Sequence, residues 1–281
     1  MNYQWYPGHM TKAKRQMQED IRLIDLVIEL VDARIPQSSR NPEIDKLAKN
    51  KGRLILLNKA DLADEKYNRL WIEHFKKKGF HILPVNSKKS QGLKPIQAIA
   101  REACQEKIAR DKRRGMIDRP LRAMVVGIPN VGKSTFINSF TGKASTKTGN
   151  KPGVTKGKQW IRLSKGLELL DTPGILWPKF EDQAVGLRLA MIGSIKDDII
   201  DITELALQII GFLKAFYPLA LNERYDIMSK ETDNYEILKM ICLNRRCFLK
   251  GEELHLSRAA GLVVDDFRNG RLGRITIDRI D

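Results

Sequence analysis

The chain has 281 residues, three cysteines and a formal net charge of +16 at pH 7. This length is enough for two domains with sizeable cores, and no apolar run approaches the roughly 20 residues that a membrane-spanning helix needs. The odd number of cysteines and the lack of a C-x-x-C pair argue against a disulfide framework and against a common zinc site.

Positive charge is concentrated in the middle of the sequence. Residues 51–180 carry 28 Lys and Arg against 10 Asp and Glu, whereas residues 181–281 carry 14 against 17. A basic surface of this size favours an anionic polymer as partner, RNA or DNA before a membrane. Solubility alone is the alternative explanation of the excess. The N-terminus lacks the basic and apolar regions of a signal peptide, so an intracellular protein is expected.

The first half of the chain alternates predicted helices with predicted strands. Apolar residues at spacings of three and four predict the helices, and short, nearly continuous apolar runs predict strands that are buried on both faces. The expected helices span residues 10–24, 42–49, 64–78 and 94–110. The expected strands span residues 26–31, 53–57, 80–85 and 121–126. This alternation predicts an α/β domain with a mostly parallel sheet and helices on both faces.

The second strand runs directly into Asn58-Lys59-Ala60-Asp61, an N-K-x-D motif. The spacing places an amide and a carboxylate at one edge of a purine pocket. Asp61 would accept hydrogen bonds from N1–H and the exocyclic amine of guanine, whereas adenine would leave this buried carboxylate unpaired. A buried polar group left without a hydrogen-bond partner raises the free energy of binding the wrong base by much more than a poor apolar fit does. The tetrapeptide is short, but beside a phosphate-binding loop it indicates a guanine nucleotide.

The third strand leads into Asn86-Ser87-Lys88. This is the position at which GTP-binding domains have an S-A-K loop, whose backbone N–H faces the guanine O6. Asn86 and Ser87 replace Ser and Ala, and because the contact comes mainly from the backbone, the replacement is compatible with the same role. A charged connector over residues 111–120 then leads to the fourth strand.

The fourth strand precedes Gly127-Ile128-Pro129-Asn130-Val131-Gly132-Lys133-Ser134-Thr135, and a predicted helix follows. The spacing is that of a P-loop, G-x-x-x-x-G-K-[ST], in which backbone N–H groups from Asn130 onward and a helix N-terminus surround phosphate oxygens. Lys133 would reach the β- and γ-phosphates, and the Ser134 hydroxyl would ligate Mg²⁺. A mere tight turn is the alternative, which the flanking strand and helix disfavour.

Two further motifs follow the P-loop. Residues 142–157 are rich in Lys, Thr and Gly without apolar periodicity, which predicts a loop. Thr155 in this loop is the candidate that ligates Mg²⁺ and contacts the γ-phosphate, as in a switch I loop. A predicted hairpin over residues 159–170 then ends in Asp171-Thr172-Pro173-Gly174, the D-x-x-G of a switch II loop. Asp171 would hold Mg²⁺ through water, and the N–H of Gly174 would contact the γ-phosphate, a contact that hydrolysis removes.

The remainder of the chain is predicted to be a helical domain. The expected helices span residues 182–195, 202–216, 234–247 and 253–268. A strand pattern returns only in the last ten residues. We therefore expect two domains, residues 1–180 and residues 181–281, of which the second carries no catalytic cluster. His255 is expected at the surface or as a satisfied residue rather than as a metal ligand.

The order of the motifs is unusual. Ras-like domains run P-loop, switch I, D-x-x-G, N-K-x-D and S-A-K, whereas here the last two come first. The domain is therefore predicted to be circularly permuted, with residues 101–120 joining the old termini. With the entry Tyr6-Pro7-Gly8-His9-Met10, the turn Asp32-Ala33-Arg34 and the helical domain, this order resembles the ribosome biogenesis GTPase A family, also called YlqF, over nearly the whole chain.

The resemblance implies a cytoplasmic GTPase that acts late in assembly of the large (50S) ribosomal subunit, and we expect the protein to be a monomer. Its partners would be precursor particles, 23S rRNA and ribosomal proteins, and no membrane. The resemblance also implies that the helical domain helps to bind RNA, although its net charge is slightly negative. RNA binding there would require its arginines to gather on one face, namely Arg245, Arg246, Arg258, Arg268, Arg271 and Arg274.

The catalytic step has no ordinary water-positioning residue, because Ile175 stands where Ras-like enzymes have a glutamine. One substitute is His9, at the start of a helix that would take the place of the switch II helix; a capped surface turn is the alternative. Another is K⁺ bound at Asn130, as in related permuted and tRNA-modifying GTPases; tolerance of the loop backbone is the alternative. The expected function is an RNA-dependent GTP hydrolase. A nucleotide-gated RNA-binding scaffold with negligible hydrolysis and a signalling GTPase acting on proteins are the other two hypotheses.

Overall fold

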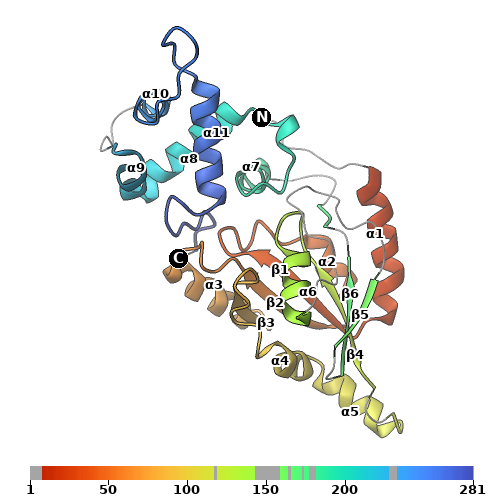
Figure 1. Ribbon diagram of the computed structural model, residues 1–281. Coiled ribbons are helices and arrows are strands. Elements are labelled where there is room, and N and C mark those ends of the chain that lie inside the picture. The colour runs from red at the N-terminus through yellow and green to blue at the C-terminus, as the bar shows by residue number, and fades with distance from the viewer. Residues whose placement is uncertain are drawn as a thin grey trace. The chain divides into compact units, whose positions relative to one another are not determined.

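The computed structural model describes residues 8–116, 119–142, 159–163, 166–172, 174–176, 182–227 and 233–280. Their contacts divide the chain into two compact units (Figure 1). The first contains residues 8–176 together with 278–280, and the second contains residues 182–277. The last residues of the chain therefore group with the first unit, whereas the sequence predicted that they end the helical domain.

A six-stranded sheet forms the centre of the first unit, in the order β3-β2-β1-β4-β6-β5. Neighbouring strands pair in parallel, except for the antiparallel hairpin of β5 and β6. The strands are β1 (Leu26–Asp32), β2 (Gly52–Asn58), β3 (His81–Val85), β4 (Leu121–Val126), β5 (Gln159–Leu163) and β6 (Leu167–Asp171). All seven residues of β1 are buried, as its continuous apolar run predicted. The predicted α/β fold with a mostly parallel sheet is confirmed.

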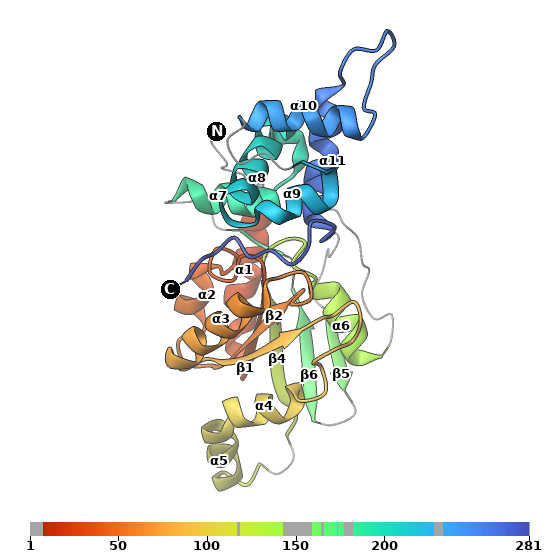
Figure 2. The same cartoon turned by 90° about the vertical axis from the view of Figure 1, so that its left-hand side faces the viewer.

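Helices cover both faces of this sheet. They are α1 (Gly8–Asp20), α2 (Pro42–Leu47), α3 (Glu65–Lys77), α4 (Ile96–Ala103), α5 (Gln105–Arg113) and α6 (Lys133–Thr141), with a 3-10 turn η1 (Ile21–Leu23) after α1. The chain moves outward along the sheet from β1 to β3 and then returns to β4 in the centre. Because parallel crossovers are right-handed, this reversal puts α4 and α6 on the face opposite α2 and α3 (Figure 2).

The helix predicted over residues 94–110 is two helices in the structure. Cys104 leaves the helical conformation, with φ −115° and ψ 14°, between α4 and α5. A Cβ on Gly52 would lie 2.7 Å from the Cys104 Sγ, so the break packs tightly against the start of β2. Apolar residues of α4 are buried, whereas α5 is strongly polar, and the break lets α5 leave the sheet.

The second unit consists of helices and turns. Its elements are α7 (Gln183–Met191), η2 (Asp197–Ile199), α8 (Ile202–Phe216), α9 (Pro218–Tyr225), α10 (Asn234–Asn244) and α11 (Leu256–Arg268). The predicted helix over residues 202–216 matches α8, but Pro218 begins a further helix, α9, which the sequence did not predict. Asp201 and Asp233 cap the N-termini of α8 and α10 with their side chains.

No single helix in the part of the chain that the structure describes is long and apolar enough to span a membrane. Only the pair α8 and α9, taken together across a bend of 116°, has the required length and apolar composition.

The strand expected in the last ten residues is absent from residues 271–280, which form turns and irregular backbone. Their backbone finds other partners, such as the Trp71 Nε1, which donates to the Asp278 carbonyl at 3.0 Å.

Candidate guanine-nucleotide site

The motifs that lie far apart in the sequence meet at one edge of the sheet. The P-loop follows β4, N-K-x-D follows β2, Asn86 follows β3 and Thr172 follows β6. These four strands run in the same direction, so their carboxyl ends share one edge. Ligands of open parallel sheets bind at this edge, where the strand order reverses. The topology therefore brings together the base-binding and phosphate-binding motifs.

The P-loop backbone needs its glycines. Gly127 and Gly132 have φ of 153° and 102°. A Cβ on Gly127 would lie 2.6 Å from the carbonyl oxygen of Leu30, and one on Gly132 would lie 2.5 Å from the Asn58 Nδ2. Asn130 has φ 58°, a left-handed conformation that asparagine adopts more readily than most residues. This conformation gives Asn130 a backbone role of its own, whatever its side chain binds.

Asn58 joins three loops of the site. Its Nδ2 donates to the Val131 carbonyl in the P-loop at 2.7 Å. Its Oδ1 accepts from the Ser87 backbone N–H at 3.1 Å and from the Ser87 hydroxyl at 2.8 Å. Ser139 on α6 then donates to the Ser87 carbonyl at 2.6 Å. Asn58 is 2% exposed, so these bonds form in a buried place where a missing partner is costly.

Lys59 supports the P-loop together with Asp32 and Arg34, which lie at the end of β1. The Lys59 Nζ donates to the Asn130 carbonyl and to the Asp32 Oδ2, both at 2.9 Å. Asp32 also accepts from the Arg34 Nε and Nη2, at 2.9 and 2.8 Å. Burial alone would raise the pKa of Asp32, but the nearby charges of Arg34 and Lys59 hold it well below its ordinary value. Asp32 is therefore an anion that fixes Lys59 under the loop.

The residues expected around the base lie close to these supports. The Ala60 N–H donates to the Val85 carbonyl at 3.2 Å, which ties the N-K-x-D turn to the end of β3. Asp61 is half-buried. Asn86 is buried, its Oδ1 accepts from the Lys89 N–H at 3.0 Å, and its Nδ2 has no hydrogen-bond partner within the part of the chain that the structure describes. A buried donor without a partner is unusual in a protein and leaves the loop with unused hydrogen-bonding capacity.

A buried cation and a buried anion face the phosphate side of the site. The Lys133 Nζ donates to the carbonyls of Gly127 and Ile128 at 3.0 and 2.9 Å. Asp171 is 2% exposed, and neither carboxylate oxygen has a hydrogen-bond partner among the described residues. Burial lowers the pKa of Lys133 and raises the pKa of Asp171, and their mutual attraction opposes both shifts. Carboxylate oxygens without hydrogen-bond partners suit a hard cation such as Mg²⁺.

Gly174 closes the phosphate side. A Cβ on Gly174 would lie 2.7 Å from the Lys133 Nζ and 2.9 Å from the Pro129 Cα, so only glycine lets the backbone come this close. Thr172 holds the start of the same loop by donating from its hydroxyl to the Val125 carbonyl at 2.6 Å. Ile175, the residue after Gly174, is 2% exposed, so its side chain is buried.

Some predicted site residues cannot be placed. Thr155 and Pro173 lie outside the described residues. His9 is the second residue of α1, but its side chain is not described. Ser134 and Thr135 lie in the first turn of α6.

The arginines expected to gather on the helical unit have different partners. Arg268 forms an ion pair with Asp197 and donates to the Ala190 carbonyl. Arg271 pairs with Asp265 and Asp266. These two guanidinium groups are therefore engaged within the unit. His255 caps α11, because its ring nitrogen accepts from the Arg258 N–H at 3.3 Å.

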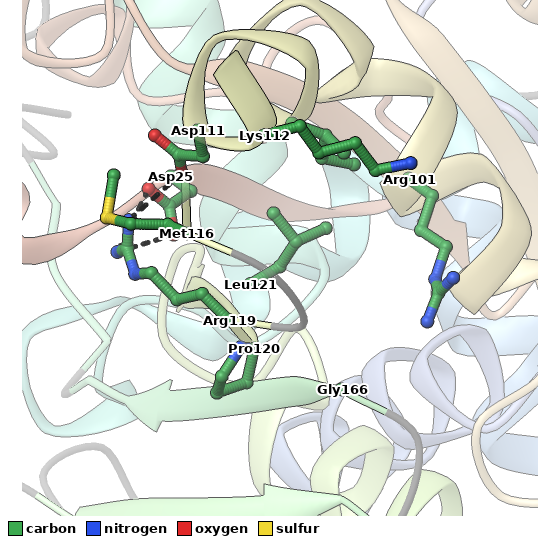
Figure 3. A pocket seen from close by; sticks show the side chains of 10 residues that line it. Asp25, Arg101, Asp111, Lys112, Met116, Arg119, Pro120, Leu121 and Gly166 are labelled. Carbon is green, nitrogen blue, oxygen red and sulfur yellow. Dashed lines mark hydrogen bonds and ion pairs between the residues drawn. The ribbon is translucent and has the colours of Figure 1, made fainter. Parts of the chain in front are cut away.

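A cavity of about 400 Å³ lies at the other end of the sheet, between α5 and the start of β4 (Figure 3). Arg119 in its wall pairs with Asp25 at 3.1 Å and with Asp111 at 3.3 Å. Arg101 and Lys112 extend away from this cluster (Figure 3). The ion pairs fasten the segment that connects α5 to β4, which is the predicted join of the permuted domain.

The fold and the site define a circularly permuted P-loop GTPase. The P-loop strand β4 is fourth in the chain yet lies in the centre of the sheet, and the base-binding motifs precede it. A family model described as "50S ribosome-binding GTPase" matches residues 122–241.

Full-length relatives identify the family. Ribosome biogenesis GTPase A of Bacillus cereus is 48% identical and covers 99% of this chain and 94% of its own length. The protein of the same name from Thermotoga maritima is 33% identical, and the match covers 98% of this chain and 94% of the relative's length. A solved structure titled as GDP-bound TM YlqF has a TM-score of 0.66 and 29% identity, over 94% of this chain and 99% of that one. The chain belongs to the ribosome biogenesis GTPase A family, and it is a GTPase of ribosome biogenesis.

Proposed function

We propose that the protein hydrolyses GTP during late assembly of the large (50S) ribosomal subunit, in the cytoplasm and in response to the particle. It would bind precursor particles through their 23S rRNA, with contacts to ribosomal proteins, and act as a monomer. The observation that carries the GTPase part is the coupling of Asn58 to both the P-loop and Ser87. The family name and the family model's description support the ribosomal part.

The site residues take the following roles in this proposal. Asp61 selects guanine, with Asn86 and Ser87 beside it, while Lys133 and the backbone N–H groups of the P-loop bind the phosphates. Ser134, Thr155 and Asp171 hold Mg²⁺, which would neutralise charge on the phosphates. RNA binding would come from the basic middle of the chain and from the exposed arginines of the helical unit, such as Arg246 and Arg258.

GTP turnover with and without ribosomal subunits tests the proposal. Purified 50S subunits should increase the rate of phosphate release, while 30S subunits should not, and binding to 50S should weaken steeply with salt because phosphate contacts release counterions. Asp61→Asn is the matched variant, since it should lose GTP selectivity while the particle surface stays intact. Equal turnover with and without 50S would reject particle-stimulated hydrolysis.

His9 and K⁺ are the two proposed sources of catalytic help. Ile175 is buried and apolar, so it cannot hold the attacking water. If His9 supplies that role, His9→Ala should lose most of the stimulated rate, by about 10²-fold, at unchanged GTP affinity. If K⁺ binds at Asn130, hydrolysis should be faster in K⁺ than in Na⁺ at equal ionic strength. Unchanged rates would remove each candidate separately.

The buried Ile175 also favours a second candidate, a nucleotide-gated scaffold that binds RNA with negligible turnover. Both candidates require GTP-dependent binding to the particle. Only the enzyme requires multiple turnovers, so counting phosphate released per protein in the presence of 50S distinguishes them.

A further inference from the structure

The C-terminal tail, residues 278–280, is docked on the first unit by several independent contacts. Asp278 is 3% exposed, and its carboxylate accepts from the Ser38 N–H and from the Ser38 hydroxyl, both at 2.7 Å. Its carbonyl accepts from the Trp71 Nε1. Arg279 lies over the Tyr67 ring, 4.5 Å from its centroid. Ile280 packs against the apolar cluster that contains Tyr67, Trp71 and Ile82. Both ribbon views place the C-terminus beside α3 (Figures 1 and 2).

The segment that Asp278 holds also carries the support of the P-loop. We call residues 32–40 the support loop. Ser39, next to Ser38, accepts from the Asp32 N–H at 3.0 Å through its hydroxyl, which itself donates to the Ile35 carbonyl at 2.7 Å. At the far end of the loop, Arg40 pairs with Glu29 at 3.0 Å. The loop is therefore a compact, buried structure that holds the Asp32 carboxylate in one place.

A series of hydrogen bonds, connected by short stretches of backbone at Ser38–Ser39 and within Asp32, thus joins the tail to the nucleotide site. It runs from Asp278 to Ser38, along the backbone to Ser39, then to Asp32, to Lys59 and finally to the Asn130 carbonyl in the P-loop. Every side chain in the series except that of Lys59 is at least nine-tenths buried. Hydrogen bonds between charged groups are stronger than neutral ones, and Asp32 and Lys59 form an ion pair at 2.9 Å.

We propose that Asp278 is a positioning residue for the guanine-nucleotide site, which it influences through the support loop and Lys59. The inference rests on the nucleotide-site roles proposed above for Lys59 and the P-loop. Releasing Asp278 would let the support loop and Asp32 move, and Lys59 would then no longer hold the Asn130 carbonyl. The P-loop would spend less time in its binding conformation, and bound GDP would leave sooner.

GDP dissociation from the full-length protein, followed with a fluorescent GDP, tests this. Asp278→Ala should increase the dissociation rate by about 10-fold, within the usual range of couplings between distant sites. Asp278→Asn keeps the shape and one set of hydrogen bonds, and should give a smaller increase, about threefold. Ile82→Val is the control, because Ile82 lies in the apolar cluster next to the tail but outside the series of contacts. This variant should destabilise the unit and leave the GDP dissociation rate unchanged.

A double-mutant cycle distinguishes positioning from general loosening. If Asp278 acts through Lys59, Asp278→Ala should change the dissociation rate by less than about twofold in a Lys59→Met background. Equal acceleration in both backgrounds, or no acceleration in the wild-type background with either Asp278 variant, would overturn the proposal. Absence of any GDP binding by the wild-type protein would instead reject the nucleotide site itself.

Discussion

The side chain of Asn58 is expected to stabilise both the first unit and its nucleotide site, and Asn58→Ala tests this. The substitution leaves the Val131 carbonyl and the Ser87 N–H, both buried, without their partners. An unsatisfied buried group costs about 1–3 kcal/mol, so we expect the free energy of unfolding to fall by about 2–4 kcal/mol. The P-loop and the Ser87 loop also lose their link, and we expect GDP affinity to fall by at least about 30-fold, or roughly 2 kcal/mol.

Two measurements on nucleotide-free protein separate these effects. Urea unfolding gives the loss of stability, and titration calorimetry gives the GDP dissociation constant. Asn41→Ala is the matched control, because Asn41 is equally buried and caps α2 by accepting from the Glu43 N–H at 3.0 Å. It should lower stability by about 1 kcal/mol without changing GDP affinity. GDP affinity of Asn58→Ala within about threefold of the wild type would refute the reasoning.

Three further predictions concern the steric limit at Gly174, the role of Asp266 in acid unfolding, and the reactivity of the Cys104 thiol. Gly174→Ala should weaken GTP binding more than GDP binding, because the new Cβ would lie 2.7 Å from the Lys133 Nζ on the γ-phosphate side; equal losses in parallel titrations would contradict this. Burial alone would raise the pKa of Asp266, but hydrogen bonds led by that of Arg224 hold it below its ordinary value. Its contribution to stability is then present above about pH 4 and lost as the pH falls, so Asp266→Asn should flatten the acid-unfolding curve in circular dichroism, and an unchanged curve would count against this pair. Burial raises the pKa of the Cys104 thiol to about 11, so iodoacetamide at pH 8 should modify it only after unfolding, and mass spectrometry that found native modification would disprove this burial.

The sequence predicted the sheet well because burial on both faces requires continuous apolar runs, as in β1 and β2. It predicted the helix ends less well where the deciding contact is remote. The break at Cys104 packs closely against Gly52, a contact that no local pattern reveals. The tail resembled a strand, but Asp278 pairs with Ser38, a residue 240 positions away.

The candidate site divides in the same manner. Residues that follow a fixed spacing, such as Asn58 and Lys133, could be found from the sequence because phosphate and guanine impose that spacing. Asp32 and Arg34 could not be assigned a role, since a short Asp-Ala-Arg turn gives no sign that its carboxylate binds a lysine 27 positions later.

The permuted order gives the helical unit an unusual position in the chain. The D-x-x-G loop, which ends at Gly174, precedes residues 182–277, and the tail with Asp278 follows them. The helical unit is therefore preceded in the chain by Gly174, which lies beside Lys133, and followed by Asp278, which binds Ser38 in the support loop. Coupling between two ligands is reciprocal, so RNA that altered the strain on either end would change nucleotide affinity, and nucleotide would change RNA affinity by the same factor.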